Sequence, residues 1–196
     1  MLYSELQCSE AIRKAVERMG FAEMTEIQEK TIPVMLAGHD VIAKAPTGTG
    51  KTCAFGIPVA EHIQPENKYP QAVIMAPTRE LAQQIAEELS NLTYFMPEVQ
   101  VACVYGGANM EKQAKRLAEG CQIVVATPGR LMDHYKHHSI DISHVTQIVL
   151  DEADEMLNMG FYKDVRHIIE MMKARKSLSM FSATISREVM DIGWLY

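Results

Sequence analysis

A glycine-rich stretch that ends in lysine and threonine follows directly after the short apolar run 41–44. Its residues are Ala45, Pro46, Thr47, Gly48, Thr49, Gly50, Lys51 and Thr52. Glycines allow backbone N–H groups to converge on phosphate oxygens, because no Cβ stands in the way. The helix that we expect next adds unpaired N–H groups and the positive end of its dipole. With Lys51 on the β- and γ-phosphates and Thr52 on Mg²⁺, the stretch predicts a nucleoside triphosphate site.

A second expected strand, 147–151, lies about a hundred residues later and ends in carboxylates: Asp151, Glu152 and Asp154. Ligands collect at the C-terminal ends of parallel strands, so Asp151 is expected to face the same crevice as Lys51. Asp151 suits Mg²⁺ held through water, and Glu152 is placed to orient or deprotonate an attacking water. The alternative for each carboxylate is a helix N-cap or first-turn acid, and it applies most to Asp154.

Short apolar runs alternate with helical patterns along the whole chain. Most of the runs are continuous, which is typical of strands buried on both faces of a parallel sheet. The expected strands cover 41–45, 72–76, 99–105, 122–126, 147–151 and 178–182. Helices are expected over 9–20, from Thr25 onward, and over 50–62, 79–92, 109–119, 129–137, 161–174 and 186–195. The series predicts an α/β fold with a mostly parallel central sheet and helices on both faces.

Composition limits the classes of function. The 196 residues carry 19 basic and 25 acidic side chains, a net charge of −6, so a nucleic acid would have to be held by a local cluster. No apolar run is long enough to span a bilayer, and the N-terminus does not resemble a signal peptide. The four cysteines are scattered without metal-ligand spacing, which favours a reduced cytoplasmic protein with no membrane partner.

Two strand-to-helix junctions carry threonine and arginine. They are Pro77-Thr78-Arg79 and Thr127-Pro128-Gly129-Arg130. Such junctions expose helix N-terminal N–H groups, which are ready sites for phosphate. Two of them on one face would hold a single-stranded backbone through sugar and phosphate, with little regard to sequence. The alternative is that Thr78 and Thr127 are simply N-caps.

Taken together, these blocks resemble the DEAD-box ATP-dependent RNA helicases. The sequence Asp-Glu-Ala-Asp at 151–154 comes after the phosphate loop, as it does in that family. Further blocks match in the family order: 20–28, 77–82, Gly106-Gly107, 127–130 and 182–184. The resemblance covers essentially the whole chain. It implies the first RecA-like core domain, a P-loop NTPase domain, with 1–38 as a helical segment bearing the adenine-reading motif and 39–196 as the ATP-binding domain.

The resemblance also implies roles for single residues. Gln28 would read adenine, although it is equally the capping-box partner of Thr25, and Tyr3 would pack near the base. Gly106 and Gly107 would join the two junctions in contacting RNA. Asp154, Ser182 and Thr184 would couple hydrolysis to strand separation. Departures from the family pattern are local: Ala45 replaces a glycine, and Met24 and Glu26 stand where prolines are common.

The expected function is Mg²⁺-dependent ATP hydrolysis coupled to RNA binding and duplex separation in the complete enzyme. The resemblance places the arginine finger on a second RecA-like domain, C-terminal to Tyr196. Two alternatives remain. In the first, the complete protein is a DNA-directed P-loop helicase or another P-loop ATPase. In the second, these residues alone form a nucleotide- and RNA-binding module that does not hydrolyse ATP.

Overall fold

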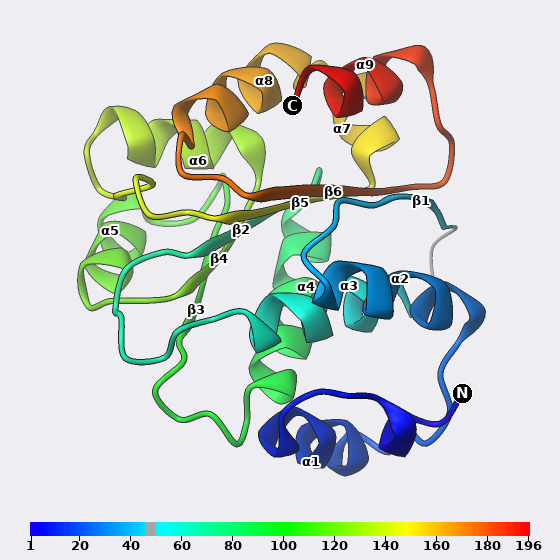
Figure 1. Ribbon diagram of the computed structural model, residues 1–196. Coiled ribbons are helices and arrows are strands. Elements are labelled where there is room, and N and C mark those ends of the chain that lie inside the picture. The colour runs from blue at the N-terminus through cyan, green and yellow to red at the C-terminus, as the bar shows by residue number, and fades with distance from the viewer. Residues whose placement is uncertain (46–49) are drawn as a thin grey trace.

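A single parallel sheet runs through the centre of the computed structural model, which describes residues 1–45 and 50–196 (Figure 1). The order of its strands is β1-β6-β5-β2-β4-β3. Each pairing between these strands is parallel, in agreement with the predicted fold. Their bounds are β1 Ile42–Lys44, β2 Ala72–Met75, β3 Val101–Val104, β4 Ile123–Ala126, β5 Gln147–Asp151 and β6 Ser177–Ser182.

Helices cover both faces of the sheet, as the sequence predicted (Figure 1). Those packed on one face are α1 Glu10–Arg18, α2 Glu26–Leu36, α3 Lys51–Glu61 and α4 Arg79–Leu92. The other core takes in residues of α5 Met110–Ala118, α6 Pro128–Lys136, α7 Ala153–Asn158, α8 Tyr162–Met171 and α9 Arg187–Leu195. All eight predicted helices are present. The short helix α7 and a 3₁₀ turn at Tyr3–Glu5 were not predicted.

Alternate side chains of each central strand enter opposite cores. Ile74 of β2 joins the core under α2, α3 and α4, whereas its neighbours Val73 and Met75 join the core under α6, α7 and α8. Every residue of β2 is therefore buried, which explains the continuous apolar run in the sequence. The N-terminal helical segment shares the first core, because Ile12 and Ile32 pack in the same cluster as the strand residues.

Parallel pairing brings the C-terminal ends of all these strands to one edge of the sheet. The strands β1, β6 and β5 lead into the segments with Lys51, Ser182 and Asp151. The other three, β2, β4 and β3, lead into the two threonine-arginine junctions and the glycine doublet. The strand order thus divides this edge into a half that bears the predicted nucleotide residues and a half that bears the predicted RNA residues.

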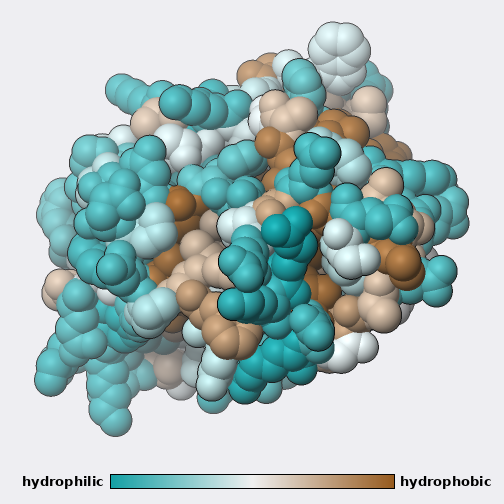
Figure 2. All heavy atoms as spheres, turned by 60° about the horizontal axis from the view of Figure 1, so that its bottom comes forward, coloured by the Kyte–Doolittle hydropathy of each residue, from teal (hydrophilic) through white to brown (hydrophobic). Residues whose placement is uncertain are grey.

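One face of the molecule offers mostly polar side chains. Figure 2 shows hydrophobic residues reaching the surface in separate places between hydrophilic ones on the face that carries α1. Within residues 1–45 and 50–196, no helix has the length and apolar character needed to cross a membrane.

Candidate nucleotide and RNA site

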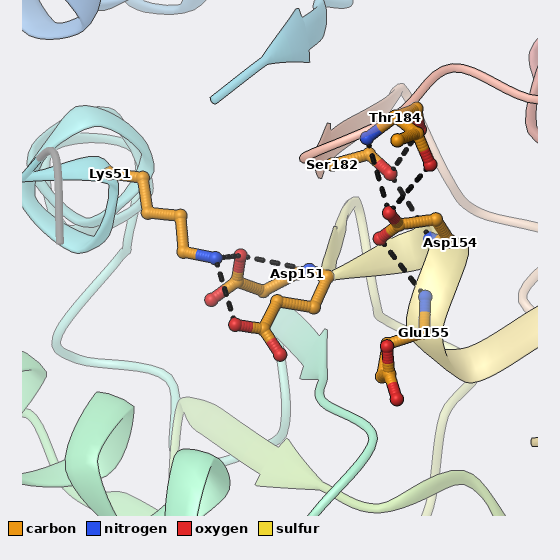
Figure 3. Close-up of polar contacts among 7 residues, drawn as sticks. Lys51, Asp151, Asp154, Glu155, Ser182 and Thr184 are labelled. Carbon is orange, nitrogen blue, oxygen red and sulfur yellow. Dashed lines mark hydrogen bonds and ion pairs between the residues drawn. The ribbon is translucent and has the colours of Figure 1, made fainter. Parts of the chain in front are cut away.

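Lys51 reaches across the sheet edge to the carboxylates at the end of β5 (Figure 3). Its Nζ lies 3.0 Å from Asp151 Oδ1 and 3.3 Å from Glu152 Oε1, although about a hundred residues separate them in sequence. Ala45 continues the pairing of β1 by donating its N–H to the carbonyl of Ser182 at 2.8 Å. The juxtaposition of lysine and carboxylates predicted from the sequence is confirmed. The predicted phosphate-cradle residues Pro46, Thr47, Gly48 and Thr49 lie outside the described residues.

Gly50 begins α3 in a conformation that needs glycine. Its φ is +76°, in the left-handed region. A Cβ built at this position would lie 2.6 Å from Gln28 Nε2 and 3.2 Å from Thr25 Cγ2. The start of α2 therefore packs directly against the start of α3.

Gln28 makes both of the contacts expected of a capping residue and two more. Its Oε1 accepts from the Thr25 N–H at 3.0 Å, and its own N–H donates to Thr25 Oγ1 at 3.4 Å, so the predicted capping box is present. The same Oε1 accepts from the buried Tyr3 hydroxyl, and Nε2 donates to the Gly50 carbonyl at 3.0 Å. Burial raises the pKa of the Tyr3 hydroxyl, which keeps it a donor. Adenine recognition by Gln28 and Tyr3 stays a prediction.

Asp151 presents an unsatisfied anionic oxygen to the site. It is fully buried, its Oδ1 binds Lys51 and the Glu152 N–H, and its Oδ2 has no hydrogen-bond partner in the part of the chain that the structure describes. Burial raises the pKa of this carboxyl, and Lys51 opposes the rise. An oxygen in this state suits a water of a hydrated Mg²⁺, so the residues present fit that ion. Its presence stays a prediction.

Thr52, the other predicted Mg²⁺ ligand, follows Lys51 in the first turn of α3. Burial raises the pKa of Glu88 on α4, and the Thr52 hydroxyl opposes that rise. The role of Thr52 toward Mg²⁺ stays a prediction.

Glu152 holds an unusual backbone conformation. Its φ of +50° and ψ of +51° lie in the left-handed region, which costs free energy for a residue with a side chain. This turn ends β5 and starts α7, and it leaves the carboxylate 3.3 Å from Lys51 Nζ. Strain of this kind at the predicted water-orienting residue is consistent with a functional site, and no feature of the sequence indicated it.

Asp154 ties α7 to the end of β6 (Figure 3). Its Oδ2 accepts from the Thr184 hydroxyl at 2.8 Å and the Thr184 N–H at 3.1 Å. The Asp154 N–H donates to Ser182 Oγ at 3.1 Å, and Ser182 Oγ in turn donates to the Thr184 carbonyl at 2.6 Å. Partial burial acts to raise the pKa of Asp154, but hydrogen bonds with Thr184 and Ser182 outweigh it and lower that pKa. Asp154 is also a first-turn acid of α7, which confirms the alternative role, and its role in coupling stays a prediction.

The predicted RNA residues lie together at the ends of β2, β4 and β3. Thr78 Oγ1 accepts from the Leu81 N–H at 3.2 Å, which confirms its capping role, whereas Thr127 makes no side-chain cap bond at its helix start. The exposed Arg79 guanidinium stacks over the Tyr105 ring at 4.8 Å. Pro77 and Pro128 are buried, and Gly106 and Gly107 are exposed.

Arg130 is engaged within the protein. Its Nη1 donates to the Ala108 carbonyl at 3.1 Å and to Gln113 Oε1 at 3.2 Å, and its Nε lies 3.7 Å from Asp133 Oδ2. Only 13% of its side-chain surface is exposed. Arg130 therefore orders the segment after the glycine doublet, and a direct RNA contact from its guanidinium stays a prediction.

The chain is similar to a known family over most of its length. A family model described as DEAD/DEAH box helicase matches residues 25–192. Among curated relatives, the ATP-dependent RNA helicase CshA of Limosilactobacillus reuteri is 49% identical over 98% of this chain. The ATP-dependent RNA helicase DeaD of Escherichia coli is 42% identical over 97% of this chain.

Solved structures agree with the sequence comparison. The crystal structure of a DEAD box protein from Methanococcus jannaschii covers all of this chain with a TM-score of 0.93 and 40% identity. That of a hypothetical ATP-dependent RNA helicase from Sulfolobus tokodaii covers 96%, with a TM-score of 0.89 and 39% identity. This chain spans 53% and 54% of those two chains. It spans only 39% of the CshA relative and 30% of the DeaD relative.

Proposed function

Because the chain belongs to the DEAD/DEAH box helicase family, we propose that it is the RecA-like, ATP-binding core domain of an ATP-dependent RNA helicase. The observation that supports this most is the contact of Lys51 with Asp151 and Glu152 at one half of the sheet edge. The other half of that edge carries the residues proposed for RNA. ATP and RNA would then bind side by side on one rigid sheet.

The residues of the nucleotide half have separate tasks in this proposal. Lys51 leaves its carboxylate partners and neutralises the β- and γ-phosphates of ATP. Asp151 would hold Mg²⁺ through a water at its Oδ2, which has no hydrogen-bond partner among the described residues, and Thr52 would hold the same ion. The ion would supply positive charge against the charge that develops on the phosphates. Glu152, held in place by its left-handed backbone, orients or deprotonates the attacking water.

Base selection would depend on the Gln28 amide. A side-chain amide presents an acceptor and a donor together, which matches the N6–H₂ and N7 groups of adenine. In the structure these atoms already bind the Tyr3 hydroxyl and the Gly50 carbonyl. Adenine would therefore compete with these contacts, and its binding would alter the hydrogen bond between Gln28 and Gly50 at the start of α3.

RNA would lie along the ends of β2, β4 and β3. An alanine methyl at Gly106 or Gly129 would meet no described atom within 4 Å, and neither residue has a positive φ. Packing therefore does not require glycine at these two positions, whereas the close approach of a ligand backbone does. Thr78, Arg79, Gly107, Thr127 and Arg130 complete this surface, which would read sugar and phosphate rather than base. RNA contacts of the buried Pro77 and Pro128 stay predictions.

Asp154, Ser182 and Thr184 are proposed to couple the two halves. Their hydrogen bonds join the helix that follows Asp151 and Glu152 to the loop that leads into α9. A change at the γ-phosphate would reach that loop through these three side chains.

Hydrolysis and unwinding are assigned to the complete protein. In related nucleotide hydrolases an arginine finger contributes about 10³–10⁵ in rate, and the family likeness places it on a second RecA-like domain. The free thiols of all four cysteines are consistent with a cytoplasmic location. The test is the ATPase rate of the complete protein with RNA and with DNA of the same sequence. Stimulation by DNA alone would favour a DNA-directed helicase. An ATPase rate for residues 1–196 that equals that of the complete protein would contradict this division.

A further inference from the structure

The two carbonyls that flank the glycine doublet are each held by a side chain from elsewhere. The carbonyl of Tyr105, before the doublet, accepts from Gln113 Nε2 at 3.0 Å. The carbonyl of Ala108, after it, accepts from Arg130 Nη1 at 3.1 Å. Gln113 and Arg130 are themselves joined, because Arg130 Nη1 also donates to Gln113 Oε1 at 3.2 Å. These contacts clamp Gly106-Gly107 to the first turn of α6.

His134 makes a further contact with Gln113. Its ring is fully buried on α6, and its Nε2 lies 2.9 Å from Gln113 Oε1. Burial lowers the pKa of His134, and the charge of Arg130 lowers it further, so the ring is neutral at pH 7.

The orientation of the Gln113 amide follows from its partners. Arg130 only donates and the Tyr105 carbonyl only accepts, so the oxygen of the amide must face Arg130 and its nitrogen must face Tyr105. His134 must then carry its proton on Nε2 in order to donate to that oxygen. This tautomer leaves His134 Nδ1 as an acceptor, and Nδ1 is one of the few buried atoms without a partner among the described residues. The hydrogen bond from His134 to Gln113 therefore leaves the buried Nδ1 of His134 without a partner among the described residues.

We propose that Gln113 is a positioning residue that, held by His134, fixes the glycine doublet and the Thr127–Arg130 junction in register for one RNA strand. Gln113 lies on α5 and is nine-tenths buried, so it does not reach RNA itself. It links the segment after β3 to the segment after β4, the two outermost parts of the RNA half. The inference rests on the proposed RNA surface.

The test uses Gln113→Met, which keeps the length of the side chain and removes its polar atoms. Affinity for a labelled single-stranded oligo(U) is measured by fluorescence anisotropy, affinity for fluorescent ADP by titration, and thermal stability by circular dichroism. We expect about tenfold weaker RNA binding, the effect of losing one or two hydrogen bonds, with ADP affinity within about twofold of the original. The exposed Gln7, far from α5 in sequence, provides the matched control Gln7→Met, which should change neither affinity.

If Gln113→Met does not fold, His134→Leu provides a second test. This variant removes the hydrogen bond from His134 to Gln113, so RNA affinity should fall. It also removes the unpaired Nδ1 of His134, so thermal stability should not fall. RNA and ADP affinities that fall in parallel, or an unchanged RNA affinity in folded variants, would overturn the positioning role. If the original chain binds RNA and Gly129→Ala weakens that binding while both clamp variants bind normally, only this inference fails. If the original chain does not bind RNA, the proposed RNA surface fails with it.

Discussion

The side-chain amide of Gln28 donates a hydrogen bond to the backbone carbonyl of Gly50 at 3.0 Å, where the start of α2 meets the start of α3. A residue proposed to read the base is thus in direct contact with the residue that precedes Lys51. Occupancy of the proposed base site and the position of the Gly50 backbone are therefore expected to depend on one another.

Gln28→Ala should narrow the preference for ATP over GTP. A site built to hydrogen-bond one base rejects a base that leaves buried polar groups unpaired, and the variant removes those groups. Competition of ATP and GTP against fluorescent ADP measures the preference. An unchanged ratio would leave Gln28 with its capping role alone. Gly50→Ala, whose Cβ would lie 2.6 Å from Gln28 Nε2, should weaken binding of both nucleotides alike.

Lys51→Ala and Glu152→Gln should separate binding from chemistry. Lys51→Ala should abolish ATP binding, because the loop loses the charge that opposes the phosphates. Glu152→Gln, made in the complete protein, should keep ATP affinity and lower the RNA-stimulated turnover by a factor on the order of 10². Calorimetric titration and a steady-state ATPase assay give the two quantities. Equal loss of ATP binding in both variants would refute the role proposed for Glu152.

Several parts of this fold and site could be predicted because their signals are local. Strands buried on both faces leave continuous apolar runs, and Thr25 with Gln28 is a complete capping signal within four residues. Helix α7 escaped prediction because it starts directly after β5 and is only six residues long, too short to show a period. The left-handed backbone of Glu152 has no sequence signal at all.

The contacts of Gln113 with Tyr105, Arg130 and His134 could not be predicted from the sequence. Its members come from three segments, after β3, on α5 and on α6, and only the fold brings them together. A faint signal existed, since Gln113 shares a helix face with the buried Leu117 four residues later. A glutamine at a core position of an amphipathic helix needs polar partners, which points to a buried network.

Gly129→Ala should raise stability while it lowers RNA affinity. The residue lies in the first turn of α6, where alanine is a better helix former by about 1 kcal/mol, and its methyl would meet no described atom within 4 Å. The same methyl would stand where the RNA backbone is proposed to approach. Urea unfolding and anisotropy with oligo(U) check the two effects. Normal RNA binding by a stabilised variant would exclude this surface.

Asp154→Asn should make the free energy of unfolding of the domain less dependent on pH in the acidic range. The folded state lowers the pKa of Asp154, so its carboxylate stabilises the fold above the unfolded pKa of about 3.9. That contribution is lost as the pH falls through the lower pKa of the folded state. The free energy of unfolding of the original chain should therefore exceed that of the variant at pH 7, and the difference should shrink below pH 4. Urea titrations at pH 7 and below pH 4 measure this difference. A difference that stays constant with pH would refute the contact with Thr184 as its source.

An RNA duplex-unwinding assay with ATP and Mg²⁺, run on residues 1–196 and on the complete protein, tests the proposed function most directly. We expect the complete protein to separate the duplex, and residues 1–196 to bind adenine nucleotide and, weakly, RNA without separating it, because the finger arginine is proposed to lie on a second domain. Adding that domain back should restore unwinding. Robust unwinding by residues 1–196 alone, or none by the complete protein with any RNA duplex, would contradict the assignment of this chain as the ATP-binding half of an RNA helicase core.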